Sequence, residues 1–360
     1  MGGVTRAKSQ SERSAELDLL RFIAASAVLF YHYTYRPLIN GVPSVSAYAG
    51  LQHISRYGYL GVPLFFLISG FVIVWSAHGR TVGQFALARF KRLYPMFWLG
   101  LAITLAVVAI RGHRAELLRP SVIAANFTML PGRFDVPAVD GVYWTLAIEL
   151  KLYLYVAILI ALNQMRHLEY WLYLWVVGLL LALCFPGISV LASLTVAPYS
   201  SYFVAGAICY LIRITGITTT RVIALIVCLG ASAWWAIGDI HEFTTAPGLA
   251  TAGTVVALIA LCYAAVVAVA VRAWQLPQLG LWFALGSLTY PLYLLHNIVG
   301  KEVLATLEPL LGDWIRLIAV ACLAYALAAV CARWGEPWVR GMCVKALSGI
   351  GELALRSRNK

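Results

Sequence analysis

Charged residues are scarce in this sequence. Only 12% of its 360 residues are Asp, Glu, Lys or Arg, whereas 62% are hydrophobic, and the mean hydropathy is +0.83. A soluble domain of this length carries about a quarter charged residues, so the composition excludes an ordinary water-soluble fold. Uncharged runs such as Leu249–Val271 are long enough to cross a bilayer. The sequence therefore predicts a membrane protein.

Closely spaced cysteine pairs are also lacking. The seven cysteines contain no CxxC spacing, and most lie inside apolar runs, where we expect them to be small core residues. This pattern predicts neither a structural disulfide nor a zinc site, and we expect no bound metal or cofactor.

Acidic residues are fewer than basic ones, 15 against 27, which gives a net charge of +12. Many of the Lys and Arg stand between apolar segments, where they orient a membrane protein and contact anionic lipid headgroups. We therefore expect membrane lipids, and not nucleic acid, as the partners of this charge.

The apolar runs predict an all-α, polytopic integral membrane protein of about ten transmembrane helices. Residues 17–337 form the predicted transmembrane domain, between a basic N-terminus (1–16) and a basic amphipathic tail (338–360). The predicted spans are Leu17–Tyr35, Tyr59–Ala77, Met96–Ile110, Val142–Leu162, Trp171–Phe185, Ile188–Ile214, Val222–Ile237, Leu249–Val271, Leu281–Val299 and Trp314–Cys331.

The distribution of Lys and Arg predicts the orientation of these spans. With the N-terminus inside, the inner segments hold 17 Lys and Arg and the outer ones 7. This bias predicts that both termini are cytoplasmic. The amphipathic tail suits a helix that lies on the inner headgroups.

The first span carries three ionisable residues, Asp18, Arg21 and His32. Eleven residues of helix turn through about 1100°, so Arg21 and His32 share one face, roughly 16 Å apart along the axis. Ionisable groups inside a span mark functional sites. The alternative is a helix-end arginine that reaches the headgroups, together with a packed histidine.

The fourth span places Thr145, Glu149 and Tyr153 on one face by their i, i+4 spacing. A carboxylate at this depth must face a cavity or a cationic partner. Both a catalytic role and a structural ion pair fit the pattern.

The ninth span places Thr289, Tyr293 and His296 on one face, and Pro291 should kink the helix beside them. His296 lies towards the outer end if the predicted orientation holds. The alternative is an interfacial histidine beside an aromatic belt.

A basic cluster of Arg89, Lys91 and Arg92 lies in the segment Gln84–Pro95, which we expect to be a loop and helix start on the cytoplasmic side. Such a cluster follows from the bias of basic residues towards the cytoplasm. It also suits phosphate binding, because arginine makes bidentate contacts with phosphate.

Together, these segments resemble the acyltransferase 3 family, whose opening motif pairs an arginine with a histidine eleven positions later. Six motifs occur in the order found in that family, from Leu17 to Pro337. They are Leu17–Ala25 with His32, Gly58–Phe71, Arg89–Pro95, Tyr143–Leu146 with Glu149, Ser287–His296, and Glu336-Pro337.

The resemblance implies a ten-span enzyme that O-acylates extracytoplasmic sugars from acetyl-CoA or a similar cytoplasmic donor. Acceptors in the family include O-antigen, exopolysaccharide, peptidoglycan, Nod factors and macrolides. Some members carry a second, hydrolase-like domain. We expect none here, which suggests a single-component enzyme or one with a separate polysaccharide-assembly partner.

Acyl transfer by this route would give each group of polar residues a role. His32 is the candidate base or acyl carrier, since imidazole does either near neutral pH, and Glu149 and His296 complete the catalytic candidates. Arg21, Arg89 and Arg92 are the donor-binding candidates for acyl-CoA. The candidates for stacking on the carbohydrate or glycolipid acceptor are Tyr143, Trp144 and Tyr293.

Two other functions remain open. A proton-coupled glycolipid transporter or flippase also needs intramembrane His, Glu and Arg, although the sequence shows no internal repeat. A non-catalytic scaffold has no need of polar faces in three separate spans. The expected location is the bacterial cytoplasmic membrane.

Overall fold

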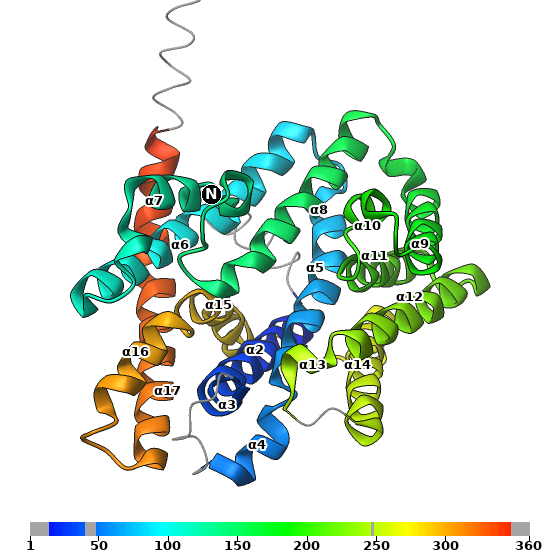
Figure 1. Cartoon of the computed structure of the whole chain (residues 1–360). Helices are drawn as coiled ribbons and strands as arrows, with labels where there is room; N and C mark the ends of the chain where they lie inside the picture. The colour runs from blue at the N-terminus through cyan, green and yellow to red at the C-terminus, as the bar shows by residue number, and fades with distance from the viewer. Residues whose placement is uncertain (1–13, 40–47, 246–247, 347–360) are drawn as a thin grey trace, which may run out of the picture. The chain divides into compact units, whose positions relative to one another are not determined.

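The computed structural model describes residues 14–39, 48–245 and 248–346, and its elements in this part of the chain are helices. Figure 1 shows their course. The longer helices are α2 (Ala15–Phe30), α5 (Gly61–Ala77), α6 (Val82–Arg111), α8 (Trp144–Ala161), α9 (Leu168–Cys184), α11 (Ser200–Thr215), α12 (Thr219–Gly238), α14 (Leu249–Ala270), α15 (Gly280–Leu295) and α17 (Asp313–Val330). The shorter α-helices are α3 (Arg36–Ile39), α4 (Ala49–Ser55), α7 (Pro120–Phe127), α10 (Ser189–Thr195), α13 (Ile240–Phe243) and α16 (Ile298–Leu307).

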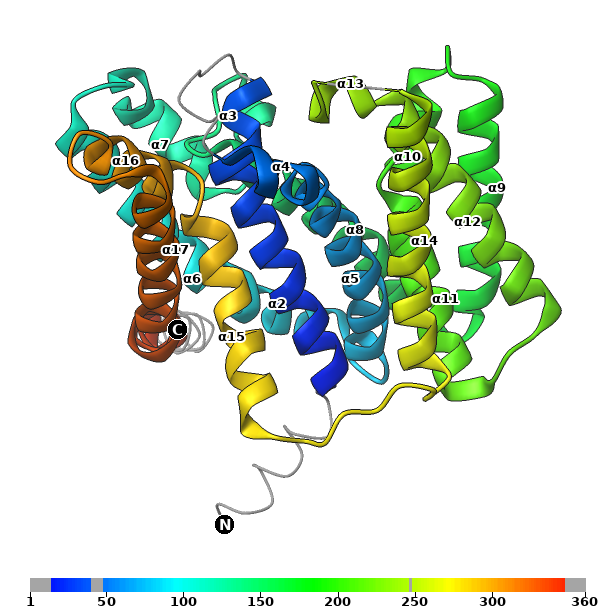
Figure 2. The same ribbon diagram turned by 90° about the horizontal axis from the view of Figure 1, so that it is seen from below.

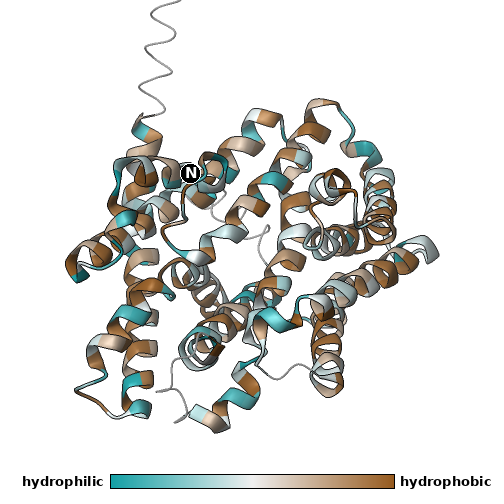
Figure 3. Ribbon diagram, viewed as in Figure 1, coloured by the Kyte–Doolittle hydropathy of each residue, from teal (hydrophilic) through white to brown (hydrophobic). Residues whose placement is uncertain are grey.

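Eight helical segments within the described residues are long and apolar enough to cross a membrane, and α15 is a shorter apolar helix. The first predicted span overlaps α2 and the ninth overlaps α15. Each of the remaining predicted spans overlaps one of the eight segments. Figure 3 shows apolar residues along most helices, with hydrophilic ones mainly near helix ends and turns. The prediction of an all-α, polytopic membrane protein is confirmed. The eight segments are Ala49–Ala77, Val82–Arg111, Gly141–Ala161, Met165–Cys184, Ser189–Thr215, Thr219–Gly238, Leu249–Ala270 and Asp313–Ala346.

The chain divides into two compact units. The first comprises residues 1–85 and 148–286, and the second comprises residues 86–147 and 287–360. The boundaries fall inside α6, α8 and α15, so each of these helices contributes residues to both units.

The first unit is built around α11. All residues from Ser200 to Ile212 are buried, and α5 lies beside this helix (Figures 1 and 2). A Cβ on Gly70 of α5 would come within 2.0 Å of the carbonyl oxygen of Phe203, and one on Gly206 of α11 within 1.9 Å of that of Leu67. The two glycines let the helix backbones touch, as small residues do at membrane helix crossings.

One predicted span is two helices. The range Ile188–Ile214 contains α10 and α11, which are separated at Val196–Tyr199. Val196 has a left-handed φ of 57°, and Pro198 lacks the N–H that a continuing helix needs. The predicted span therefore corresponds to one apolar segment, Ser189–Thr215, that is broken into two helices.

The expected boundaries of two other segments were wrong. Helix α6 begins at Val82, long before the predicted start at Met96, so the basic cluster lies on a helix and not in a loop. The predicted span Leu281–Val299 is interrupted, because α15 ends at Leu295 and α16 begins at Ile298. His296 therefore lies in the turn between two helices.

The last predicted span, Trp314–Cys331, is too short. The helix runs from Asp313 to Ala346, through a π-helical turn η8 at Cys331–Gly335. The first part of the predicted amphipathic tail is thus helical and continuous with α17. Residues 347–360 of that tail, and residues 1–13 of the basic N-terminus, lie outside the described residues.

Candidate active site

His32 lies in a π-helical turn, η1 (Tyr31–Tyr35), that follows α2 directly. Single π turns inside α-helices occur frequently at functional sites. The Nδ1 atom of His32 is 2.9 Å from the carbonyl oxygen of Val28. Because a carbonyl only accepts hydrogen bonds, Nδ1 carries the proton and donates it. The other ring nitrogen, Nε2, is then the basic atom of the neutral imidazole.

A proline explains where this wide turn forms. Pro37 stands two residues beyond η1, and in a regular α-helix its ring would clash with the carbonyl of Tyr33, four residues earlier. In η1 the N–H of Arg36 instead reaches back five residues to the carbonyl of Tyr31. Turn η8 repeats the pattern before Pro337, with the N–H of Glu336 bonded to the carbonyl of Cys331.

Two glycines of the second motif support the His32 helix. A Cβ on Gly58 would lie 2.1 Å from the carbonyl oxygen of Ala27, and one on Gly61 would lie 2.5 Å from that of Ala24. Only glycine fits at such contacts. The motif therefore holds the segment Gly58–Leu60 (η3) and the start of α5 directly against the turn of α2 that precedes His32.

A chain of aromatic contacts begins at His32 in the first unit. The ring of Tyr31 makes an edge contact with His32, with centroids 5.3 Å apart, and also lies 5.7 Å from the ring of Tyr59. Tyr59 in turn stacks on Phe243 of α13, at 4.4 Å and 7° between the planes. The hydroxyl of Tyr35 contacts that of Thr244 at 2.9 Å. These contacts attach the α13 segment to the His32 turn.

Arg21 lies on the same helix as His32, in the first unit. Its guanidinium donates to the carboxylate of Asp18 at 3.3 Å. Asp18 is covered from the other side, because a Cβ on Gly286 of α15 would come within 2.5 Å of its side chain. Gly286, the residue of α15 with which the first unit ends, thus packs on the opening motif within that unit.

Glu149 accepts a hydrogen bond of 2.6 Å from the hydroxyl of Tyr153, one helical turn further along α8. The predicted shared face of Glu149 and Tyr153 is confirmed by this contact. The ring of Tyr153 packs edge-on against Phe85 at 6.1 Å.

The second unit joins the polar faces of the fourth and ninth spans. The hydroxyl of Thr145 lies 2.9 Å from that of Tyr293, which donates to the carbonyl of Val142 at 3.0 Å. The hydroxyl of Tyr143 is 3.3 Å from that of Thr104. Tyr143 and Tyr293 are buried in this network, whereas Trp144 is 40% exposed.

His296 is buried in the turn between α15 and α16, and its Nδ1 lies 2.8 Å from the carbonyl oxygen of Tyr293. Beside it, the buried carboxylate of Asp140 accepts from the side-chain amide of Asn297 and from the backbone N–H of Ile298 and of Val142. Sequence reasoning missed Asp140 and Asn297. An aspartate directly before an apolar helix is a helix-capping signal that could have identified the first of them.

Arg92, on α6 in the second unit, lies over the ring of Tyr290 at 5.9 Å, and Tyr290 donates to the carbonyl of Leu93 at 3.2 Å. Arg89 is half-buried on the same helix. The third and fifth motifs therefore contact each other directly.

The structure thus groups the predicted site residues into two sets. The first unit holds Arg21, His32 and Glu149, and the second holds Arg89, Arg92, Tyr143, Trp144, Tyr293 and His296. Their assigned roles remain predictions. Within the described ranges, no group of three or more His, Cys, Asp or Glu is placed to hold a metal ion.

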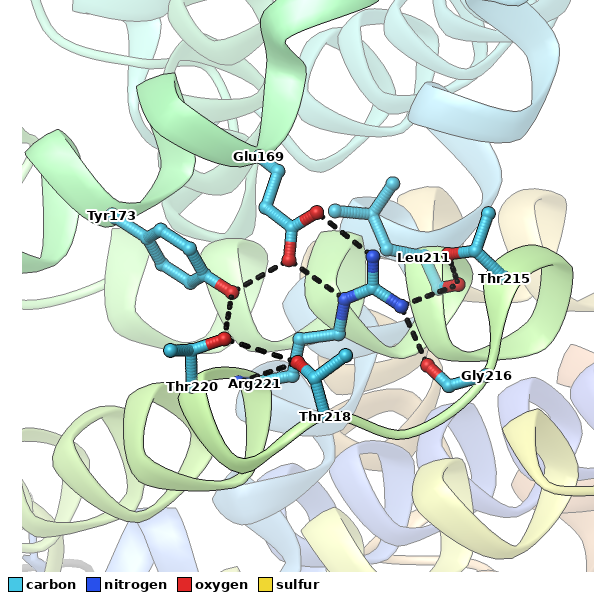
Figure 4. Close-up of polar contacts among 8 residues, drawn as sticks. All are labelled: Glu169, Tyr173, Leu211, Thr215, Gly216, Thr218, Thr220 and Arg221. Atoms are coloured by element: carbon cyan, nitrogen blue, oxygen red, sulfur yellow. Dashed lines mark hydrogen bonds and ion pairs between the residues drawn. The ribbon is translucent and has the colours of Figure 1, made fainter.

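A further polar network contains none of these residues. Arg221, at the start of α12, forms a bidentate pair of 2.8 Å contacts with Glu169 of α9 and donates to the carbonyl of Gly216 (Figure 4). Glu169 also accepts from Tyr173, and Thr218 caps α12 by accepting from the N–H of Arg221. We call this set the ion-pair network. It joins the ends of α9, α11 and α12.

Several apolar helices long enough to cross a membrane define the chain as a polytopic membrane protein. A family model described as "Acyltransferase domain" matches residues 14–333, nearly the whole chain. The chain therefore belongs to the acyltransferase 3 family and is an acyltransferase-family enzyme of the membrane.

Individual relatives are similar over parts of the chain. Acyltransferase MdmB of Streptomyces mycarofaciens is 36% identical over 23% of this chain and 21% of its own length. ORF330 of Acidianus two-tailed virus is 26% identical over 49% of this chain and 48% of its own length. Protein 2 in the picA locus of Rhizobium radiobacter is 35% identical over 28% of this chain and 48% of its own. No solved structure matches significantly.

Proposed function

We propose that this enzyme transfers an acetyl or similar acyl group from a cytoplasmic acyl-CoA to a hydroxyl of an extracytoplasmic carbohydrate, such as exopolysaccharide or O-antigen. The proposed location is the bacterial cytoplasmic membrane, with both termini cytoplasmic. The single observation that carries the proposal is the geometry of His32, a half-buried imidazole in a π turn whose Nδ1–H is committed to the carbonyl of Val28.

This geometry supports acid–base chemistry at Nε2. In the transfer step, the acceptor hydroxyl gives its proton to Nε2 while its oxygen bonds to the thioester carbonyl carbon. The carbon–sulfur bond then breaks, and the sulfur of CoA takes the proton from the imidazolium. The products are an ester and free CoA. If His32 instead carries the acyl group, Nε2 attacks the thioester first and CoA leaves as the thiolate. The acceptor hydroxyl then takes the acyl group, its proton passes to the thiolate, and the neutral imidazole is restored.

The proposed contacts with the acyl donor rest on the pairing of phosphate with arginine. The CoA phosphates need cationic partners, and arginine binds phosphate in a bidentate manner. Arg21, on the His32 helix, and Arg89 and Arg92, on α6, supply these groups in the proposal. The name of the Streptomyces relative, an acyltransferase, supports the reaction class.

Transfer by purified protein tests the proposal. The protein in proteoliposomes is given radiolabelled acetyl-CoA and a surface polysaccharide. The polysaccharide comes from the bacterium that encodes the protein, and mild alkali has removed its O-acetyl groups. We expect label in ester linkage on the polysaccharide and release of free CoA, both lost in His32→Ala. Movement of a glycolipid across the bilayer without any labelled ester would overturn the proposal in favour of a transporter.

A further inference from the structure

Asp140 is a fully buried carboxylate that links two helix starts in the second unit. Its Oδ1 accepts from the N–H of Val142 at 3.1 Å and from the side-chain amide of Asn297 at 2.6 Å. Its Oδ2 accepts from the N–H of Ile298 at 3.0 Å. The carboxylate therefore stabilises the beginnings of α8 and α16 and fixes the turn that contains His296.

These contacts determine how the Asn297 amide is oriented. A carboxylate only accepts hydrogen bonds, so the NH₂ end of the amide must face Asp140 and the carbonyl oxygen, Oδ1, must face away from it. Asn297 is 8% exposed, and its Oδ1 is buried without a hydrogen-bond partner among the described residues. A buried acceptor without a donor is costly, and proteins rarely tolerate one without a reason.

Asn126 of the same unit shows the usual state of a buried amide. Its NH₂ group donates to the carbonyls of Val122 and Pro137, and its Oδ1 accepts from the N–H of Val139 at 2.9 Å. Both ends of this amide are used within the protein. Asn297 differs in that its NH₂ end is bound by Asp140, whereas the buried oxygen at its other end has no partner among the described residues.

The chemistry of the missing partner follows from the atom that lacks one. Oδ1 requires a hydrogen-bond donor. The thioester and the phosphates of an acyl-CoA only accept, and its donors are few, the amide N–H groups of the pantetheine arm among them, whereas a carbohydrate carries a donating hydroxyl on most of its carbon atoms. The requirement favours the acceptor substrate over the reactive end of the donor.

We propose that Oδ1 of Asn297 accepts a hydrogen bond from a hydroxyl of the carbohydrate acceptor, and that Asp140 is the positioning residue that orients this amide. The inference rests on the proposed acyl transfer and adds an acceptor-binding residue to it. The contact is to a hydroxyl that recognises the acceptor and is separate from the proton transfer at His32.

Steady-state kinetics with Asn297→Ala test the contact, using radiolabelled acetyl-CoA and de-acetylated surface polysaccharide. The KM for the polysaccharide should rise about tenfold, the loss of one good hydrogen bond, while the KM for acetyl-CoA stays within twofold. Asp140→Asn allows the amide to turn over and should raise the same KM. Adding Asn297→Ala to it should add little, because both changes remove one contact.

Asn126→Ala is the matched control for loss of a buried amide. It should lower the melting temperature of the protein more than Asn297→Ala does, because its hydrogen bonds are all internal. An unchanged polysaccharide KM in Asn297→Ala, or an equal rise in the KM for acetyl-CoA, would overturn the inference alone. A wild-type protein that transfers no acyl group would overturn the proposed function and this inference with it.

Discussion

His32 and His296 lie in polar turns of different units, and the two imidazoles are held in the same way. In each, Nδ1 faces a backbone carbonyl of the preceding turn, that of Val28 at 2.9 Å and that of Tyr293 at 2.8 Å. Both rings are therefore fixed in the tautomer that leaves Nε2 basic. Orientation by the helix backbone is a property that the two sites share.

The surroundings of the two histidines differ. His32 is half-buried in a π turn and contacts the ring of Tyr31, whereas His296 is 1% exposed, next to the buried carboxylate of Asp140. The base of the transfer step must meet both the acceptor hydroxyl and the thioester, and the half-buried ring of His32 favours it as the catalytic residue. The comparison predicts that His296 supports the reaction mainly through the turn that it occupies.

The largest effect is expected for His32→Gln. Glutamine keeps the size of the side chain and its hydrogen bonding to Val28 but accepts no proton, so transfer should fall by about 10²–10⁴-fold. Acyl transfer is measured with purified protein. The amount of the variant in the membrane and its affinity for acetyl-CoA should equal those of the wild type. If the variant kept more than about a tenth of the activity, the catalytic assignment would move to His296 or Glu149.

His296→Gln should have a smaller effect, a loss of transfer of about tenfold or less, accompanied by a lower melting temperature. The reason is that a buried side chain in a packed turn contributes to structure. The same transfer assay and a thermal unfolding curve separate the two contributions. A loss larger than that of His32→Gln, in a protein of unchanged stability, would reverse the roles of the two histidines.

The helical fold was predictable because long apolar runs report membrane spans directly. Helix ends were not, because Gln, Ala, Leu, Arg and Lys are good helix formers and continue a helix beyond its apolar run even where they are exposed. Arg89 and Arg92 were expected near a helix start but lie well within α6. The π turns before Pro37 and Pro337 were also missed, although the prolines that account for them stand in the sequence.

The site was predictable where its residues lie on one helix. The contact between Glu149 and Tyr153 follows from their spacing and was found. The contact between Thr145 and Tyr293 joins residues 148 positions apart, and such a pairing depends on packing that no single periodicity encodes. Asn297 carries no pattern in the sequence, and only the contact with Asp140 makes it a candidate.

An intermediate effect is expected for the basic cluster. The double substitution Arg89→Ala with Arg92→Ala should raise the KM for acetyl-CoA about tenfold and leave the polysaccharide KM unchanged. Arg92→Lys should recover only part of the affinity, because lysine keeps the charge but loses the bidentate contact. Unchanged donor affinity in the double variant would mean that the cluster serves topology alone, a result that leaves the contrast between the two histidines intact.

The smallest effect on transfer is expected at the ion-pair network, which contains no predicted site residue. Arg221 is 6% exposed in its side chain and Glu169 34%, so Arg221→Ala leaves a partly buried carboxylate without its bidentate partner. Breaking a fully buried pair costs about 3–5 kcal/mol, and the exposure of Glu169 reduces the expected loss of stability to roughly 1–3 kcal/mol. Denaturant unfolding in detergent measures this loss, while transfer per folded molecule should remain within twofold of the wild type.

Arg221→Lys keeps the charge but loses the bidentate contact, so its free energy of unfolding should fall between those of the wild type and Arg221→Ala. The opposite result would be loss of transfer in Arg221→Ala protein that is still folded. An ion pair whose groups are all bonded within the protein would then be needed for transfer. The exposure that distinguishes His32 from His296 would no longer suffice to identify the catalytic residue.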